Sequence, residues 1–305
     1  MSVDTILVVG GTGNQGQAVI EQLNDIGTDY EILALTRDTS TDHAQAAAEL
    51  GAKLVEGDLA DPETLQPYLD RADKVWATIN FWAVGYDAHI ELGENLAAAI
   101  EEADGLEHVV YSGAGDQQKE TDVPHIESHR VVSERLSETG VPYTALKPVY
   151  FMENWETIGV EDGVLAFPLD EETHHYQTTY HDTGRASAVS LDNTEEFAGN
   201  EYTIASDLLT LKETVDIISE VTDEAVEPYY VPLDEAEEEF GEEFAIMCDH
   251  FINEGGHTSF TANIRRVERE FGFTPQTFEE YLRENEWEGG KEEPSHVPGW
   301  VKAMQ

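Results

Sequence analysis

The stretch Gly10-Gly11-Thr12-Gly13-Asn14-Gln15-Gly16 determines the expected fold of this chain. It follows a short apolar run at residues 6–9 and precedes apolar residues at helical spacing between positions 19 and 26. This order predicts a strand, a glycine turn and a helix that together bind a dinucleotide. Gly10 suits the tight turn, Gly13 lets a pyrophosphate approach the backbone, and Gly16 lets the helix pack closely. The free N–H groups at the helix start favour phosphate. A helix start that is merely rich in glycine is the alternative.

The charge balance is strongly acidic. The chain contains 64 Asp and Glu residues against 16 Lys and Arg, a net charge of −48, and the acids are spread along its whole length. A charge of this size repels itself in dilute buffer. At about 1 M salt the Debye length falls to about 3 Å and the repulsion is screened. We therefore interpret the sequence as halophile-type. The same charge argues against direct binding of nucleic acid, which requires a basic surface.

Length and composition indicate a globular protein. The chain has 305 residues, of which 40% are hydrophobic, enough for a substantial core. No run is long and apolar enough to span a bilayer, and the first strand begins without a preceding signal peptide. Cys248 is the single cysteine, so no intrachain disulfide can form. We expect a cytoplasmic protein with no membrane contact.

Strand-like and helix-like segments alternate through the first half of the chain. This alternation predicts an α/β fold, a Rossmann-type doubly wound parallel sheet, followed by a smaller C-terminal α/β lobe. We expect an NAD(P)-binding domain over residues 1–150 and a substrate or partner lobe over 151–305, with the chain crossing back into the sheet. Expected strands are 5–9, 30–36, 52–55, 73–79, 107–112 and 143–149; expected helices are 14–26, 41–50, 62–70, 87–103 and 125–139. Later segments predict a strand at 202–205, helices at 211–221, 234–252 and 278–285, and a loosely packed tail over 287–305.

Two later turns bear on the choice of cofactor. An acidic residue about twenty positions past Gly16 would hold an NAD ribose, but the sequence there is Leu35-Thr36-Arg37-Asp38. The planar guanidinium of Arg37 suits a 2′-phosphate, which favours NADP, although Asp38 leaves NAD open. A surface arginine paired to Asp38 is the alternative. After the next strand, Asp58 could accept from the adenine amino group while Leu59 packs on the ring. A helix-capping role is the alternative for Asp58.

These motifs resemble the NmrA-like family of atypical short-chain dehydrogenase relatives, including its redox-sensor branch. The glycines keep the G-x-x-G-x-x-G spacing of the wider superfamily, and the resemblance covers roughly residues 4–220. The other markers are residues 35–37, 57–59, 80–82, 109–113, 123–125 and, most distinctively, 147–154. The resemblance implies an NADP-preferring Rossmann domain, a smaller lobe and a cleft between them. It also implies contacts on the nicotinamide side near Asn80, Phe81, Tyr150, Phe151 and Asn154.

Active short-chain dehydrogenases use a Tyr and a Lys four residues apart on a helix. The pair Tyr143 and Lys147 has this spacing, but its segment is predicted to be a strand, on which the two residues would lie about 13 Å apart. On the helix expected to carry the pair, the Tyr position is His125 and the Lys position is His129. Ser112, at the end of the preceding strand, lies where the serine that assists the Tyr–Lys pair is often found. Either both imidazoles form a binding surface, with His129 on the ribose, or His125 acts as an acid. We favour binding.

Two further groups offer weaker hypotheses. His174, His175 and His181 lie in a region expected to be a surface loop without supporting cysteine, so we expect no metal. The segment 182–185 resembles a turn of the family and is expected to cap the following helix. Aromatic residues could form a platform for a ring-shaped substrate or simply fill the core: Phe81, Trp82, Tyr150, Phe151 and Trp155.

The sequence thus predicts an NAD(P)-binding protein that prefers NADP and acts as a redox or cofactor sensor or regulator with little dehydrogenase activity. The alternative is an NAD(P)H-dependent reductase of a quinone-like or carbonyl substrate. A nucleotide-sugar epimerase would share the fold but requires the missing Tyr–Lys pair. We expect a dinucleotide as ligand, and a regulatory protein or a second copy of the chain as candidate protein partners.

Overall fold

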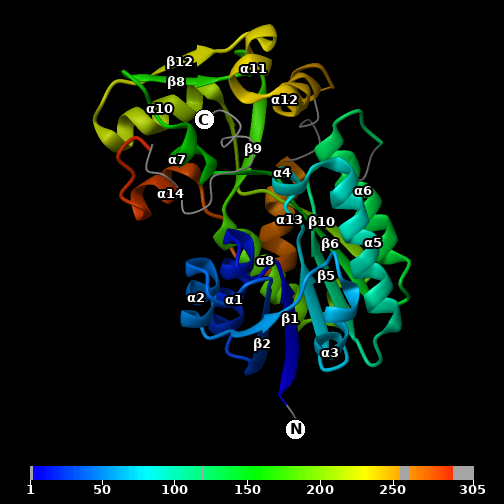
Figure 1. Cartoon of the computed structure of the whole chain (residues 1–305). Coiled ribbons are helices and arrows are strands. Elements are labelled where there is room, and N and C mark those ends of the chain that lie inside the picture. Colours follow the sequence, from blue (N-terminus) through cyan, green and yellow to red (C-terminus); the bar gives the residue numbers. More distant parts are fainter. Residues whose placement is uncertain (1–2, 118–119, 255–260, 291–305) are drawn as a thin grey trace. The chain divides into compact units, whose positions relative to one another are not determined.

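The computed structural model describes residues 3–117, 120–254 and 261–290 (Figure 1). Contacts divide the chain into two compact units. The first contains the chain up to Pro148 together with Tyr180–Thr203, and the second contains Val149–Thr179 together with the chain from Ile204 onward. The chain therefore leaves the first unit, returns to it and leaves it again. Within the described ranges, no helix combines the length and apolarity needed to cross a membrane.

A seven-stranded sheet forms the centre of the first unit, in the order β10-β6-β5-β4-β1-β2-β3. Every neighbouring pair among β1 to β6 is parallel. The strands are β1 (Asp4–Val9), β2 (Tyr30–Thr36), β3 (Lys53–Glu56), β4 (Lys74–Ala77), β5 (His108–Ser112), β6 (Tyr143–Pro148) and β10 (Asn200–Ile204). The order reverses between β1 and β4, the position at which open α/β sheets bind ligands.

Helices cover both faces of this sheet. One face packs on α3 (Gln66–Leu69), α5 (Tyr86–Glu102) and α6 (Pro124–Ser137), through a core that includes Leu96, Val132 and Leu136. The other face contacts α1 (Asn14–Asp25) and α8 (Tyr180–Asp192). Figure 1 shows α5 and α6 beside β5 and β6. The remaining helical segments of this unit are α2 (Asp42–Glu49), the 3₁₀ turn Pro62–Thr64, α4 (Phe81–Val84) and α9 (Thr194–Phe197). The doubly wound α/β prediction is confirmed.

The segment 182–185 does not cap a following helix, because α8 already begins at Tyr180. Its glycine serves close packing instead. A Cβ on Gly184 would lie 2.8 Å from the backbone carbon and oxygen of Ala18, on α1. Backbone atoms cannot move aside as a flexible side chain can, so glycine permits the close approach of α8 to α1. The expected helix cap was wrong.

The second unit contains two small sheets. A three-stranded sheet has the order β11-β9-β7, and a two-stranded sheet pairs β12 with β8. Its strands are β7 (Tyr150–Phe151), β8 (Val164–Phe167), β9 (His174–Thr178), β11 (Asp207–Thr210) and β12 (Glu227–Tyr230). Its helices are α7 (Asn154–Ile158), α10 (Leu211–Thr222), α11 (Leu233–Phe240), α12 (Glu242–Glu254), α13 (Thr261–Phe271) and α14 (Phe278–Glu284). The two domain ranges expected from the sequence stay a prediction.

Most expected elements are present, with three differences. The acidic helix expected over 234–252 is two helices, because Gly241 adopts a φ of +91° and ends α11. The helix expected over 62–70 is a 3₁₀ turn followed by the single turn of α3. Helices α4, α7, α8, α9 and α13 were not expected. Most of the predicted tail, including Trp300, lies outside the described residues.

Candidate functional site

The sequence-predicted residues of the first unit gather at one edge of its sheet. The glycine turn follows β1, Thr36 ends β2 with Arg37 next, Asp58 lies just after β3, and Asn80 follows β4. Because these four strands are parallel, their carboxyl ends meet at the same edge. The fold therefore brings together motifs that are separated by as many as seventy residues in the sequence.

The glycine turn closes tightly on itself. Gly10 adopts a φ of +82°, and a Cβ there would lie 3.0 Å from the backbone oxygen of Thr78. The Gly13 N–H donates to the Gly10 carbonyl at 3.0 Å, and Gly13 is the N-cap of α1. A Cβ on Gly16 would lie only 2.2 Å from the Gly10 oxygen. The first N–H groups of α1, including those of Asn14 and Gln15, point out of the helix start without helical acceptors.

Side chains fix this turn to the neighbouring strands. The Ser112 hydroxyl, at the end of β5, donates to Gln15 Oε1 at 2.8 Å. The Ser112 carbonyl in turn accepts from the Thr78 hydroxyl at 2.9 Å. Gln17 Nε2 donates to the Thr12 carbonyl at 2.9 Å. The serine expected as a catalytic helper is fully buried and holds the turn in place.

Arg37 is exposed at the end of β2 and does not pair with Asp38. The Asp38 carboxylate instead accepts from the Ser40 N–H at 2.8 Å and from the Ser40 hydroxyl at 2.6 Å, and these bonds lower the pKa of Asp38. The Thr36 hydroxyl donates to the Asp38 carbonyl at 3.1 Å and accepts from the Asp38 N–H at 3.2 Å. Within the described ranges no carboxylate forms an ion pair with Arg37. In a chain so rich in acids, this leaves the guanidinium available to a ligand.

Asp58 and Leu59 form a turn of their own. Asp58 Oδ1 accepts from the Ala60 N–H at 3.0 Å, and the Asp58 N–H donates to the Thr64 hydroxyl at 2.9 Å. The Leu59 side chain is half-buried against the core beneath α5, and its carbonyl accepts from Asn95. One carboxylate oxygen of Asp58 is therefore committed to its own turn, and the N-cap of the following 3₁₀ turn is Asp61, so Asp58 does not take the capping role of the alternative.

Asn80 is the N-cap of α4, and Phe81 is its first residue. The Phe81 ring is buried, 5.3 Å from the ring centroid of Trp82 and 5.2 Å from that of His125. Trp82 is half-exposed and lies over His125 at 5.0 Å with an interplanar angle of 31°. The short helix α4, which we did not expect, therefore brings two aromatic rings against α6.

Three imidazoles meet beneath these rings. His129 lies 4.3 Å from His89 of α5 and 5.1 Å from His125, measured between ring centroids. His125 and His129 are one turn apart on α6, the helix that the sequence predicted to carry them. The Tyr111 hydroxyl of β5 lies 2.7 Å from His129 Nδ1. This imidazole cluster, made of His89, His125 and His129, carries no acidic partner among the contacts described.

Burial keeps the imidazole cluster neutral. It lowers the pKa of His89 to about 4 and that of His125 to about 3, and it lowers the pKa of His129 well below the ordinary value of a histidine. Proximity to the other rings lowers the last two pKa values further. The Ile79 carbonyl slightly favours a protonated His89, yet neither ring nitrogen of His89 has a well-formed hydrogen bond to any described residue. Desolvation without an acidic partner favours the neutral ring.

Tyr111 and His89 were missed by the sequence analysis, although a signal for one of them exists. Tyr111 directly precedes Ser112 in a strand, and successive strand residues point to opposite faces. Ser112 contacts the glycine turn, so Tyr111 must face α5 and α6. Helix α6 has no tyrosine at the position of His125, but the phenol of Tyr111, on β5, contacts His129.

Three expected dinucleotide contacts belong to the second unit. Tyr150 and Phe151 form β7, which pairs with β9, and Asn154 begins α7. The Tyr150 ring packs in an aromatic group with Trp155, Phe167 and His175 at centroid distances of 5.2 to 5.6 Å. Trp155 is fully buried and donates from Nε1 to Gln177 at 2.9 Å, so it fills the core of this unit.

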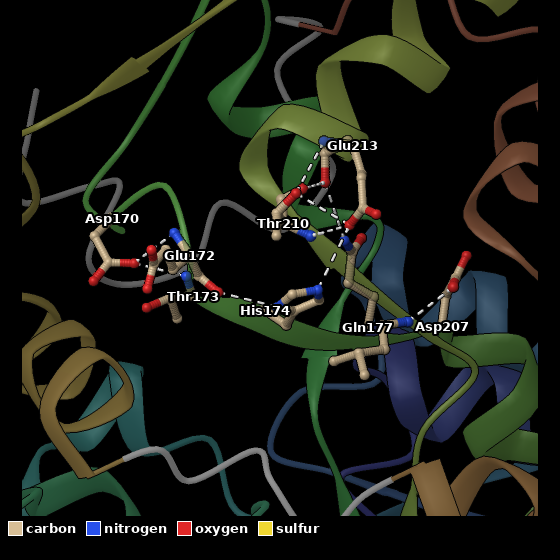
Figure 2. A network of polar contacts seen from close by, with 10 residues as sticks. Asp170, Glu172, Thr173, His174, Gln177, Asp207, Thr210 and Glu213 are labelled. Atoms are coloured by element: carbon tan, nitrogen blue, oxygen red, sulfur yellow. Dashed lines mark hydrogen bonds and ion pairs between the residues drawn. The ribbon is translucent and has the colours of Figure 1, made fainter.

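His174 and His175 lie on β9 rather than in the surface loop that we expected. His175 is buried, whereas His174 faces a polar network in which its Nδ1 meets the Glu172 carbonyl at 3.0 Å (Figure 2). Its Nε2 lies 4.0 Å from Glu213, which closes a capping box with Thr210 at the start of α10. His181 lies on α8, in the other unit. In the part of the chain that the structure describes, no three His, Cys, Asp or Glu residues are placed to hold a metal ion.

Tyr143 and Lys147 lie on β6, which confirms the strand that we predicted for them. The Tyr143 hydroxyl bonds Ser133 at 2.7 Å, and Lys147 Nζ donates to Glu201 at 2.9 Å. The two groups thus have different partners.

A model of the NmrA-like family matches residues 2–282. This chain belongs to the NmrA-like family. An NmrA-like family domain-containing protein of Dictyostelium discoideum is 24% identical over 91% of this chain and 96% of its own length. The family assignment that the glycine turn and the segment 147–154 predicted is therefore confirmed.

Solved structures share the fold of this NmrA-like chain. NmrA, a negative transcriptional regulator solved with NADP, has a TM-score of 0.76 at 17% identity, covering 93% of this chain and 95% of that one. An NADPH-dependent quinone oxidoreductase of Escherichia coli, solved with NADPH, has a TM-score of 0.78 at 20% identity, covering 92% of this chain and 99% of that one. The regulator has also been solved with NAD. The family fold thus supports both a regulator and an enzyme.

The imidazole cluster predicts a defined pH dependence of stability. The pKa of His89 falls from 6.5 to about 4 on folding, so between these values the unfolded chain binds more protons than the folded one. Lowering the pH through this window should therefore lower the free energy of unfolding, by about 3 kcal/mol at most from this ring. We expect His89→Leu to flatten the dependence, measured by urea unfolding in about 2 M KCl at successive pH values.

Leu96→Ala, a core truncation in the same helix, is the matched control. It should lower stability at every pH by about 2–5 kcal/mol and leave the slope unchanged. Equal slopes for the wild type and His89→Leu would contradict the burial of a neutral His89.

Proposed function

We propose that this NmrA-like protein binds a nicotinamide dinucleotide along the edge formed by the carboxyl ends of β1–β4. The geometry of the glycine turn carries the proposal. A backbone turn fixed by the Gly10–Gly13 hydrogen bond, with no side chain at Gly13, leaves room for a pyrophosphate at the start of α1. We propose that the protein acts as a redox or cofactor sensor or regulator with little or no dehydrogenase activity.

The proposed contacts follow from the positions of the residues in the first unit. Residues 10–16 would hold the pyrophosphate, Thr36 and Arg37 the adenosine ribose, and Asp58 and Leu59 the adenine. Asn80, Phe81 and His129 would lie towards the nicotinamide. The family resemblance also implies contacts from Tyr150, Phe151 and Asn154, which belong to the second unit and stay a prediction.

A preference for NADP rests on Arg37. Its guanidinium has no ion pair within the described residues, while the neighbouring Asp38 is occupied by Ser40. A guanidinium offers a bidentate fork to phosphate, and a carboxylate engaged with Ser40 is poorly placed to select the ribose hydroxyls of NAD.

The imidazole cluster favours a sensor over an enzyme. A proton donor is most effective when its pKa lies near the working pH, whereas the pKa of His125 is about 3. At neutral pH this ring can hydrogen bond and stack, and it is a weak source of protons. A regulatory protein, or a second copy of the chain, is the proposed recipient of the signal. We propose a cytoplasmic location, since Cys248 is the single cysteine and a reducing compartment needs no disulfide.

A reductase of a quinone-like or carbonyl substrate is the second candidate. The half-exposed Trp82 stacked on His125 supports it, because a flat ring could pack against that surface. The E. coli relative of this fold is itself an NADPH-dependent quinone oxidoreductase.

Replacing Arg37 tests the cofactor preference. We expect Arg37→Gln to raise the Kd for NADPH about ten- to hundredfold, the loss of a charge-assisted contact worth about 1.5–3 kcal/mol, and to leave the Kd for NADH unchanged. The measurement is a titration followed by nicotinamide fluorescence in about 2 M KCl. Arg71→Gln is the control, since Arg71 pairs with Glu31 near the opposite end of β2. Equal weakening of both nucleotides would remove the basis for NADP selection, and failure of the wild type to bind either would refute the proposed function.

Replacing His125 separates the sensor from the reductase. A sensor should bind NADPH without consuming it in the presence of a panel of small quinones, and His125→Phe should then have no activity to remove. A reductase should consume NADPH, and His125→Phe should abolish that consumption while NADPH still binds. Loss of absorbance at 340 nm reports consumption. Turnover by the wild type would replace the sensor with the reductase as the best description.

We also propose that the protein is adapted to molar salt, on the basis of its net charge of −48. Screening of this charge should raise the midpoint of thermal unfolding steeply between about 0.1 and 2 M KCl. Sorbitol at matched osmolality is the control, because it does not screen charge. A midpoint that KCl leaves unchanged would refute the adaptation.

A further inference from the structure

The hydrogen bond between Tyr111 and His129 constrains the proton of a buried imidazole. The Tyr111 side chain is fully buried on β5, and its hydroxyl lies 2.7 Å from His129 Nδ1. No other hydrogen bond to this hydroxyl forms within the described residues. A neutral imidazole carries one N–H and one acceptor nitrogen, and a phenol carries one O–H.

Only one arrangement of protons satisfies this pair. If Nδ1 carried the proton and donated to the phenol oxygen, the Tyr111 O–H would be buried without an acceptor, which is costly. If the phenol donates to Nδ1, both groups are satisfied. Burial supports two neutral partners, because it raises the pKa of Tyr111 and lowers that of His129. The proton of His129 is therefore on Nε2.

Of the two ring nitrogens of His129, Nε2 is the one that no described residue occupies. The buried nitrogens without a hydrogen-bond partner among the described residues include both of His89 and Nδ1 of His125, but not Nε2 of His129. This Nε2 forms no hydrogen bond to a described residue either, so it retains access to solvent although the residue is 4% exposed. His129 thus has an N–H donor at Nε2, which no described residue occupies, and an acceptor at Nδ1, which is bonded to Tyr111.

We propose that Tyr111 is a positioning residue for dinucleotide binding, which holds His129 in the Nε2–H tautomer so that it donates to an oxygen acceptor such as a ribose hydroxyl. Tyr111 does not touch the ligand and acts through His129. A neutral donor fixed in this way replaces the ammonium that a lysine would supply at the same helical position. The inference rests on the proposed dinucleotide binding.

The tautomer is measured directly on the ligand-free protein. Long-range ¹H–¹⁵N correlation spectra of the histidine-labelled full chain, assigned with His129→Gln, should show His129 protonated at Nε2. In Tyr111→Phe the signature should shift towards a mixture of tautomers. A wild-type His129 protonated at Nδ1, or a signature that Tyr111→Phe leaves unchanged, would overturn the inference. The wild-type spectrum keeps it falsifiable even if the variant does not fold.

Binding supplies the second readout. We expect Tyr111→Phe to raise the Kd for NADPH about three- to tenfold, the cost of one misdirected hydrogen bond. Tyr143→Phe is the matched control, because it also removes a buried hydroxyl with a 2.7 Å bond, to Ser133, in the adjacent strand. It should leave the Kd and the His129 signature unchanged. Equal weakening by both variants would show a merely structural effect and overturn the positioning role.

The two proposals fail in different ways. If the wild type binds no dinucleotide, the proposed function fails and the positioning role falls with it, whatever the spectra show. If the wild type binds NADPH and Tyr111→Phe changes the tautomer without changing the Kd, dinucleotide binding stands and the positioning role is overturned.

Discussion

The first unit depends on a contact between backbone atoms in the glycine turn, where Gly16 lies directly against the Gly10 carbonyl. A side chain on Gly16 would place its Cβ 2.2 Å from that oxygen, so the contact exists only because there is none. It allows α1 to begin immediately after β1, with its N–H groups at the edge of the sheet. The Ser112–Gln15 hydrogen bond then fixes β5 to the turn, and the close approach at Gly184 places α8 on α1. A short glycine-rich segment thus organises strands and helices far along the chain.

The acidic residues of the molecule are charged and require screening by solvent, whereas its buried imidazoles are neutral. A net charge of −48 is tolerable only where water and salt can screen it. The rings of the imidazole cluster are largely removed from both, so they stay neutral and interact through hydrogen bonds and ring contacts. A site of neutral rings beside an aromatic surface is suited to holding a ligand. It is less suited to supplying protons, which is why binding is favoured over catalysis.

Local sequence patterns predicted much of the fold. They failed for residues whose position or role depends on burial and on pairing with distant segments. The apolar runs and glycine turn predicted the parallel strands, and the strand Tyr143–Pro148 excluded a false catalytic pair. The histidines at 174 and 175 were wrongly placed in a loop, because the pairing of β9 with β11 and β7 involves residues distant in sequence. Trp155 could equally be core or platform until its burial and its bond to Gln177 were known.

The sequence by itself determined the parallel strands, the glycine turn, the helix with His125 and His129, and the family to which the chain belongs. These features follow from spacing within short segments, where period and residue type are sufficient. Only the tertiary structure decided that Tyr111 bonds His129, that His89 completes the imidazole cluster, and that Asp38 bonds Ser40 and leaves Arg37 unpaired among the described residues. Those outcomes depend on which side chains meet across strands and helices, and on how much water they lose there, neither of which a single segment contains.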